Sequence, residues 1–136
     1  MSNNGSNNWD VSYSVISFFE RVLNGNHLVI SFSREDDIFF KIKKYDGSEL
    51  KLLLVTEYVL GLEAVLRAKS EFPDMDYILT NADWNGYTKE AKMYGLENDI
   101  GVFYLTEFLK ALKWDNPKEY HTKDDKGNPV YGYCSA

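Results

Sequence analysis

Four lysines form the only concentration of basic side chains in an otherwise acidic sequence. Lys41, Lys43, Lys44 and Lys51 stand on the two sides of a predicted hairpin turn, with Tyr45 among them. Ammonium groups gathered in this way could contact the phosphates of a nucleic acid. Lysines also keep a solvated strand edge from aggregating, a role that requires no ligand. The cluster is therefore a candidate nucleic-acid contact with a structural alternative.

A loop at residues 81–86 is a second candidate site. It carries Asp83 and Trp84 where a predicted strand ends and a helix begins, and ligands often bind at such places in α/β proteins. Turn formation and helix capping explain the same residues without a ligand. His27 and His121 have no neighbours at the spacing of a metal site or a catalytic triad, so we interpret both as structural.

The composition restricts the partners and the compartment. The chain has 136 residues, the length of one domain, and its net charge of −6 counts against duplex DNA as the main partner unless basic charge gathers locally. Its one cysteine, Cys134, can form no intramolecular disulfide, which fits a reducing compartment. Residues 1–8 lack the apolar run of a signal peptide, and no segment approaches a membrane span. We therefore expect a cytoplasmic protein that does not enter a membrane.

Hydrophobic periodicity predicts alternating helices and strands. Apolar residues recur at helical spacing after Asp10, which is expected to cap a first helix that ends near Asn24. Apolar and polar residues alternate on both sides of Asp46-Gly47, which predicts a hairpin. The predicted strands are 27–33, 37–45, 49–55, 77–80 and 100–105, and the later helices are 56–71, 87–98 and 106–114.

This order of elements, α-β-β-β-α-β-α-β-α, predicts an α/β domain with a mixed β-sheet flanked by helices. The first three strands form an antiparallel meander, whereas the strand–helix–strand units that follow require a parallel pair with a right-handed crossover. In this prediction residues 9–114 form the domain. Residues 1–8 are a flexible lead, and residues 115–136 are a polar tail or hairpin.

Four stretches in this order resemble the restriction-endonuclease-like superfamily, especially its Mrr-type branch. They are Phe19-Glu20-Arg21-Val22-Leu23, Asp36-Asp37-Ile38, Leu62-Glu63-Ala64, and Thr80 with Tyr87-Thr88-x-x-Ala91 and Ile100-Gly101-Val102-Phe103. Together they cover residues 15–112. The resemblance implies the fold of these nucleases, but a fold alone does not determine function.

The resemblance also implies a metal site, which this sequence does not complete. In such nucleases an Asp on the second strand, and a Glu or Gln two residues before a Lys on the third, bind Mg²⁺ and position a water. Hairpin geometry places Asp37 opposite residues 53–57, where the second acid and the Lys are expected. Residues 52–55 read Leu-Leu-Leu-Val instead, and leucine cannot bind a metal. We therefore expect a degenerate catalytic motif.

Two carboxylates could still replace the missing ligand. Glu49-x-Lys51 has the expected spacing, but at ~3.3 Å per residue it lies too far along the strand to share a metal with Asp37. Glu57, just beyond the strand end, could approach Asp36 or Asp37, although it also suits the first turn of a helix. Glu20 matches a residue that adds a ligand in some relatives, although a plain surface glutamate on the helix is the favoured explanation.

Three hypotheses follow. The first is a nuclease-fold domain without cleavage activity that serves as a binding or regulatory module, in a prokaryotic nucleic-acid-processing or defence system as the resemblance suggests. It needs no cofactor. The second is an active DNA endonuclease in which Asp36, Asp37 and Glu57 hold Mg²⁺ and Asp37, Glu57 and Glu20 are catalytic. The third is an acidic protein-interaction or immunity-type module. Partners are then DNA or a protein, and a homodimer is compatible with the fold.

Overall fold

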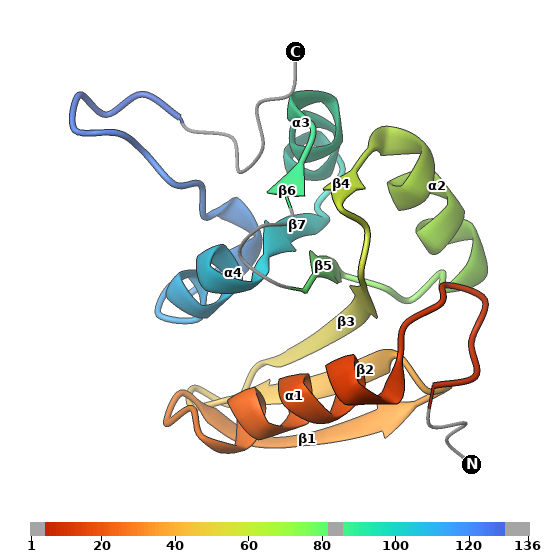
Figure 1. Ribbon diagram of the computed structural model, residues 1–136. Helices are drawn as coiled ribbons and strands as arrows, with labels where there is room; N and C mark the ends of the chain where they lie inside the picture. Colours follow the sequence, from red (N-terminus) through yellow and green to blue (C-terminus); the bar gives the residue numbers. More distant parts are fainter. Residues whose placement is uncertain (1–4, 82–85, 130–136) are drawn as a thin grey trace.

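The computed structural model describes residues 5–81 and 86–129, which build a sheet with helices on both faces (Figure 1). The helices are α1 (Tyr13–Asn24), α2 (Leu62–Glu71), α3 (Lys89–Glu97) and α4 (Leu105–Ala111), followed by a 3-10 turn η1 (Pro117–Glu119). The strands are β1 (Val29–Glu35), β2 (Phe39–Lys44), β3 (Glu49–Val55), β4 (Val59–Leu60), β5 (Tyr77–Thr80), β6 (Gly86–Tyr87) and β7 (Gly101–Tyr104). Within the described ranges no helix is long and apolar enough to cross a membrane.

The main sheet is mixed, as predicted. Its strand order is β1-β2-β3-β5-β7, with β1, β2 and β3 antiparallel and β3, β5 and β7 parallel. The α/β class and the mixed sheet are therefore confirmed. Two further strands were not predicted: β4 and β6 each have two residues and pair in parallel as a separate small sheet.

Aromatic side chains hold the layers together. Phe19 of α1 meets Phe40 of β2 edge-on with ring centroids 5.0 Å apart, and Phe108 of α4 lies 6.5 Å from Phe19 on the same face. On the opposite face Phe72, at the end of α2, stacks on Phe39 at 5.4 Å. Burial of these rings on both faces supplies much of the hydrophobic stabilisation of the domain.

The first helix begins later than predicted, at Tyr13, and its N-cap is Ser12 rather than Asp10. The cause lies in Asn7, whose side-chain oxygen accepts hydrogen bonds from the backbone N–H groups of Trp9 and Val11 at 3.1 and 3.0 Å. These bonds hold the chain in a loop that buries Val11 completely and Trp9 to 5 % exposure. Residues 5–8, expected to be a flexible lead, are thus docked onto the domain.

Other boundaries differ for local reasons. The helix predicted over 56–71 begins only at Leu62, because Val59 and Leu60 pair with β6 and Gly61 is the N-cap. Tyr87 belongs to β6, and Thr88 caps α3 by accepting from the N–H of Ala91.

The C-terminal third shows similar shifts. The helix predicted over 106–114 begins one residue earlier, at Leu105 with Tyr104 as its N-cap, and ends at Ala111. In the tail, an antiparallel bridge joins Lys123 and Pro129. Asp83, Trp84 and Cys134 lie outside the described residues.

Candidate functional site

Asp37 is a fully buried carboxylate in the turn between β1 and β2. The N–H of Gly5 donates to both of its oxygens at 3.1 and 2.9 Å, and the side-chain amide of Asn7 donates to one of them at 2.8 Å. Arg34 Nη1 donates to the other oxygen at 3.0 Å. The backbone at Asp37 has φ 68°, in the left-handed region that Asp tolerates better than most residues. The acid is therefore held by the turn, the N-terminal loop and one guanidinium.

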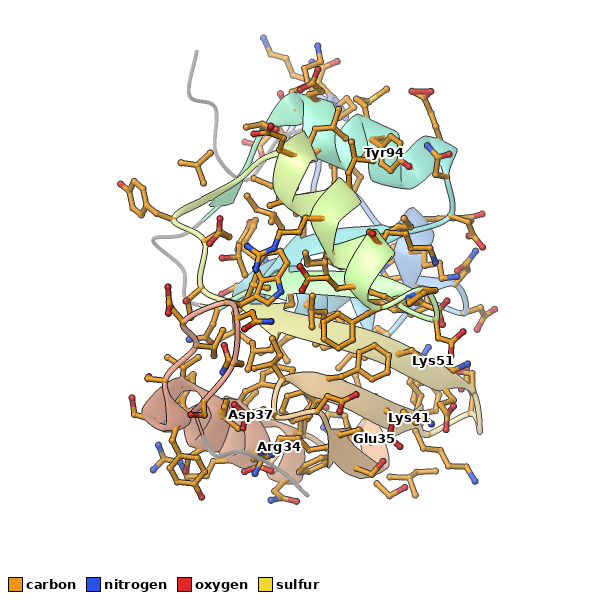
Figure 2. The ribbon with its side chains drawn as sticks, turned by 90° about the vertical axis from the view of Figure 1, so that its right-hand side faces the viewer. Arg34, Glu35, Asp37, Lys41, Lys51 and Tyr94 are labelled. Carbon is orange, nitrogen blue, oxygen red and sulfur yellow. The ribbon has the colours of Figure 1, made fainter. Side chains whose placement is uncertain are left out.

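Arg34 links this acid to a second one. Its Nε lies 3.2 Å from the carboxylate of Glu20 on α1, and its Nη1 also donates to the main-chain oxygen of Asp37 at 3.1 Å. The Arg34 side chain is 12 % exposed and that of Glu20 27 %. A guanidinium that is always protonated supplies fixed positive charge here. The structure thus brings together two of the predicted acids, Glu20 and Asp37, around an arginine (Figure 2 labels Arg34 and Asp37).

Asp36 and Glu57 are placed elsewhere. Asp36 is exposed and lines a small hollow with Trp9 and Phe72, whereas Glu57 lines a separate hollow with Trp9 and residues of α2. The main-chain oxygen of Glu57 accepts a hydrogen bond from the Thr80 hydroxyl, which fixes this segment outside any helix. In residues 5–81 and 86–129 no group of three or more His, Cys, Asp or Glu side chains is arranged to hold a metal ion.

The register of the hairpin agrees with the geometry expected from the sequence. Phe39 pairs with Leu53, and the N–H of Leu54 donates to the main-chain oxygen of Ile38. Asp37 therefore stands beside the end of β3. The four residues there, Leu52 to Val55, are all fully buried and apolar. They provide neither a second metal ligand nor a lysine.

The lysine cluster divides into three exposed or half-exposed residues and one buried residue. Lys44 is fully buried, with its Nζ donating to the main-chain oxygen of Trp114 at 2.7 Å and lying 3.6 Å from Asp46. Its neighbours in the sequence point to the opposite face: Lys41 pairs with Glu35 at 3.3 Å and lies beside Lys51 across the strands. Lys44 consequently cannot contact a phosphate in this arrangement. The alternation along β2 could have indicated its burial, because Lys44 lies on the same face of the strand as the buried Phe40 and Ile42.

No family model, curated protein or solved structure matches this chain.

A buried polar cluster between α3 and α4 was not predicted from the sequence. Lys92 of α3 lies 3.1 Å from Glu107 of α4, and both side chains are almost completely buried. Glu107 also accepts hydrogen bonds from the hydroxyls of Tyr87 and Thr122 at 2.8 and 2.9 Å. Burial lowers the pKa of Lys92 to about 8, although the charge of Glu107 acts in the other direction. The cluster joins α3, α4, β6 and the tail, and its members are too far apart in the sequence to form a recognisable motif.

Proposed function

We propose that this chain is a restriction-endonuclease-like domain that does not cleave nucleic acid and acts as a binding or regulatory module. The prokaryotic nucleic-acid-processing or defence context rests on the resemblance of four sequence stretches alone. The proposal is compatible with the observed succession of helix, three antiparallel strands, helix and parallel strand.

The observation that carries the proposal is the set of donors around Asp37. Two main-chain contacts from Gly5, one amide and one guanidinium occupy both oxygens of the acid that a nuclease of this type would offer to Mg²⁺. A hard divalent ion needs several free oxygen ligands, and it would be repelled by the adjacent arginine charge. Metal-assisted hydrolysis at this position is therefore disfavoured by charge as well as by geometry.

The end of β3 supports the same proposal. Buried leucines stand where a second acid and a lysine would be required, and Glu57 lines a different hollow from Asp36. Without a second acid and a lysine at the end of β3, the charge that develops on the phosphate loses the stabilisation that a nuclease of this type provides there.

Cleavage assays test the proposal. Purified wild-type protein is incubated with supercoiled and linear DNA in Mg²⁺ or Mn²⁺, beside the variants Asp37→Ala and Glu57→Gln. We expect no cutting by any of them. Cutting by the wild type that either variant abolishes would overturn the proposal in favour of an active endonuclease. Asp37→Ala removes a buried group and can unfold the domain, so a loss of cutting in that variant alone would be ambiguous. Glu57→Gln changes a half-buried residue and should stay folded, so its effect on cutting can be interpreted.

A further inference from the structure

The outer edge of β1 is open. β1 borders the main sheet beside β2, and no strand in residues 5–81 and 86–129 pairs with its other side (Figure 1). The strand at the opposite border, β7, has only four residues, and three of them are buried. β1 has seven residues, none of them buried. It is therefore the longer and the more exposed of the two sheet edges.

The main chain of Phe32, in the middle of β1, points away from the sheet. The N–H of Lys44 donates to the main-chain oxygen of Ser48 at 2.9 Å, so the main chain of Lys44 faces β3. The direction of these groups alternates along a strand, and Lys41, three residues earlier, therefore faces β1. Its partner there is Ser33, whose N–H and C=O consequently bond inward to β2. Those of Phe32 point outward, and no residue in the described ranges bonds to them.

β1 lacks most of the features that keep a sheet edge from pairing with another chain. Protected edges usually carry Lys or Pro, or a β-bulge that twists the strand away. The sequence of β1 contains neither Lys nor Pro. Its bulge lies at the beginning of the strand, between Val29 and Ser31, and leaves the rest of the ladder regular. Its one cation, Arg34, is held by Glu20 and Asp37. The regular part of this edge is therefore suited to accept another strand.

The centre of the edge is symmetric in sequence. Ser31 and Ser33 flank Phe32, and their side chains lie on the opposite face of the sheet from its ring. An antiparallel copy of β1, paired with Phe32 opposite Phe32, would place each Ser31 opposite the Ser33 of the other copy. Aromatic pairs and pairs of hydroxyl side chains both stabilise neighbouring antiparallel strands. Ile30, which is 60 % exposed, would be covered in the same register.

Helix α1 extends this surface with an exposed aromatic residue. Glu20 of α1 contacts Arg34 of β1 at 3.2 Å, so the helix face that carries Glu20 is turned toward β1. Tyr13 stands seven residues before Glu20, which places it on the same face, and it is 48 % exposed. When two β1 strands pair antiparallel, the two copies of α1 lie on one face of the joined sheet. The second copy would therefore cover Tyr13 as well.

We propose that a second copy of this chain binds at the open edge of β1, with the two β1 strands antiparallel about a two-fold axis at Phe32. The N–H of each Phe32 then donates to the main-chain oxygen of the other, and two five-stranded sheets become one continuous sheet. A two-fold partner uses the same surface twice, so the symmetric centre of β1 favours a second copy over an unrelated strand. The inference goes beyond the proposed function and does not depend on it.

Sedimentation equilibrium at increasing protein concentration tests this proposal. A single strand pair buries less surface than a standard interface, so we expect a weak dimer with a Kd on the order of 100 μM. Ser33→Lys places an ammonium group opposite Ser31 of the second copy, close to Lys43 beyond it, and should weaken the dimer about fivefold or more. Ser70→Lys, at an exposed position on α2, is the matched control and should leave the Kd within about twofold. Each variant changes the net charge from −6 to −5.

Amide hydrogen exchange of the wild type distinguishes this edge from any other contact, and it does not require Ser33→Lys to fold. The amide of Phe32 should exchange quickly in dilute protein and slowly in concentrated protein, whereas that of Ser33 should exchange slowly in both. A wild type that stays monomeric near 1 mM, at about ten times the expected Kd, would overturn the proposal. So would a folded Ser33→Lys that dimerises like the control, or a Phe32 amide whose exchange does not change with concentration.

Discussion

The guanidinium of Arg34 lies 3.0 Å from the buried carboxylate of Asp37 and contacts Glu20 on its other side at 3.2 Å. One fixed positive charge thus serves two acids, at the place where the sequence resemblance implies a divalent metal. Arginine suits this position because its planar group can donate to several acceptors at once. The charge of Asp37 is therefore compensated within the chain itself.

Loss of the Asp37 carboxylate should destabilise the fold strongly. Asp37→Ala leaves Arg34 and the donors of Gly5 and Asn7 without their buried acceptor, and we expect the free energy of unfolding to fall by about 3–5 kcal/mol. Urea denaturation followed by circular dichroism measures the change. Glu57→Ala is the control, expected within about 0.5 kcal/mol of the wild type because Glu57 is only half-buried. Equal stability of the two variants would contradict a structural role for Asp37.

Asn7→Ala should loosen the N-terminal loop. The Asn7 side chain accepts from the N–H groups of Trp9 and Val11 and donates to Asp37, so its loss should cost about 1–3 kcal/mol. Amide hydrogen exchange should accelerate at Gly5 and Trp9. Asn8→Ala is the matched control, because Asn8 contributes its main-chain oxygen to Arg67 and that atom is unchanged. Unaltered exchange in Asn7→Ala would refute the docking of this loop through Asn7.

Breaking the buried pair of Lys92 and Glu107 should be costly, and removing both charges should not. Lys92→Met leaves Glu107 as an uncompensated buried charge, for which we expect a loss of about 3–5 kcal/mol. Adding Glu107→Gln to the same variant should restore part of that loss, because the amide stays neutral and can still accept from Tyr87. Chemical denaturation of the single and double variants checks this. A double variant less stable than Lys92→Met would contradict the expectation.

The same pair predicts an unusual dependence of stability on pH. Since burial lowers the pKa of Lys92 to about 8 from an ordinary value of 10.5, the unfolded chain binds more protons than the folded one between these values. Stability should therefore rise with pH from about 8 toward 10, by at most ~1.4 kcal/mol per pH unit.

Tyr77 should limit this rise. Burial raises its pKa above the ordinary value of 10, so above pH 10 the folded chain binds more protons than the unfolded chain and stability should fall. Urea titrations across this range should show a maximum near pH 10. Lys92→Met should abolish the rising part of the curve, and a rise that persists in this variant would assign it to another group.

Elements with strong local patterns were predictable from the sequence. The hairpin at Asp46-Gly47 and the strands at 49–55 and 77–80 have the predicted bounds, because alternating or continuous apolar residues meet clear turn signals there. The register that places leucines beside Asp37 also followed from strand geometry. Hairpins, strand bounds and strand register depend on residues that are close together in the sequence, so they can be predicted from it.

Long-range polar contacts were not predictable. Gly5 and Asn7 donate to Asp37 from 32 and 30 residues away in the sequence. Glycine and asparagine are also the residue types expected in a flexible segment, so the sequence gives no sign of these contacts. Likewise Lys44 is a charged residue of the kind usually found on the surface. It is buried here because its ammonium group donates to the main-chain oxygen of Trp114, 70 residues away in the sequence. Pairing of this kind requires tertiary structure, because a buried charge is tolerated only where a partner is already in position.

Paramagnetic Mn²⁺ added to isotopically labelled protein reports which backbone amides lie near a bound ion, and therefore whether Asp37 holds a divalent metal. We predict no selective loss of the amide signals of Gly5, Arg34, Asp37 and Ile38, because Arg34 and the N-terminal donors already satisfy the Asp37 carboxylate. Selective loss of these four signals at low Mn²⁺ would place a metal at Asp37 and refute the proposed loss of the metal site.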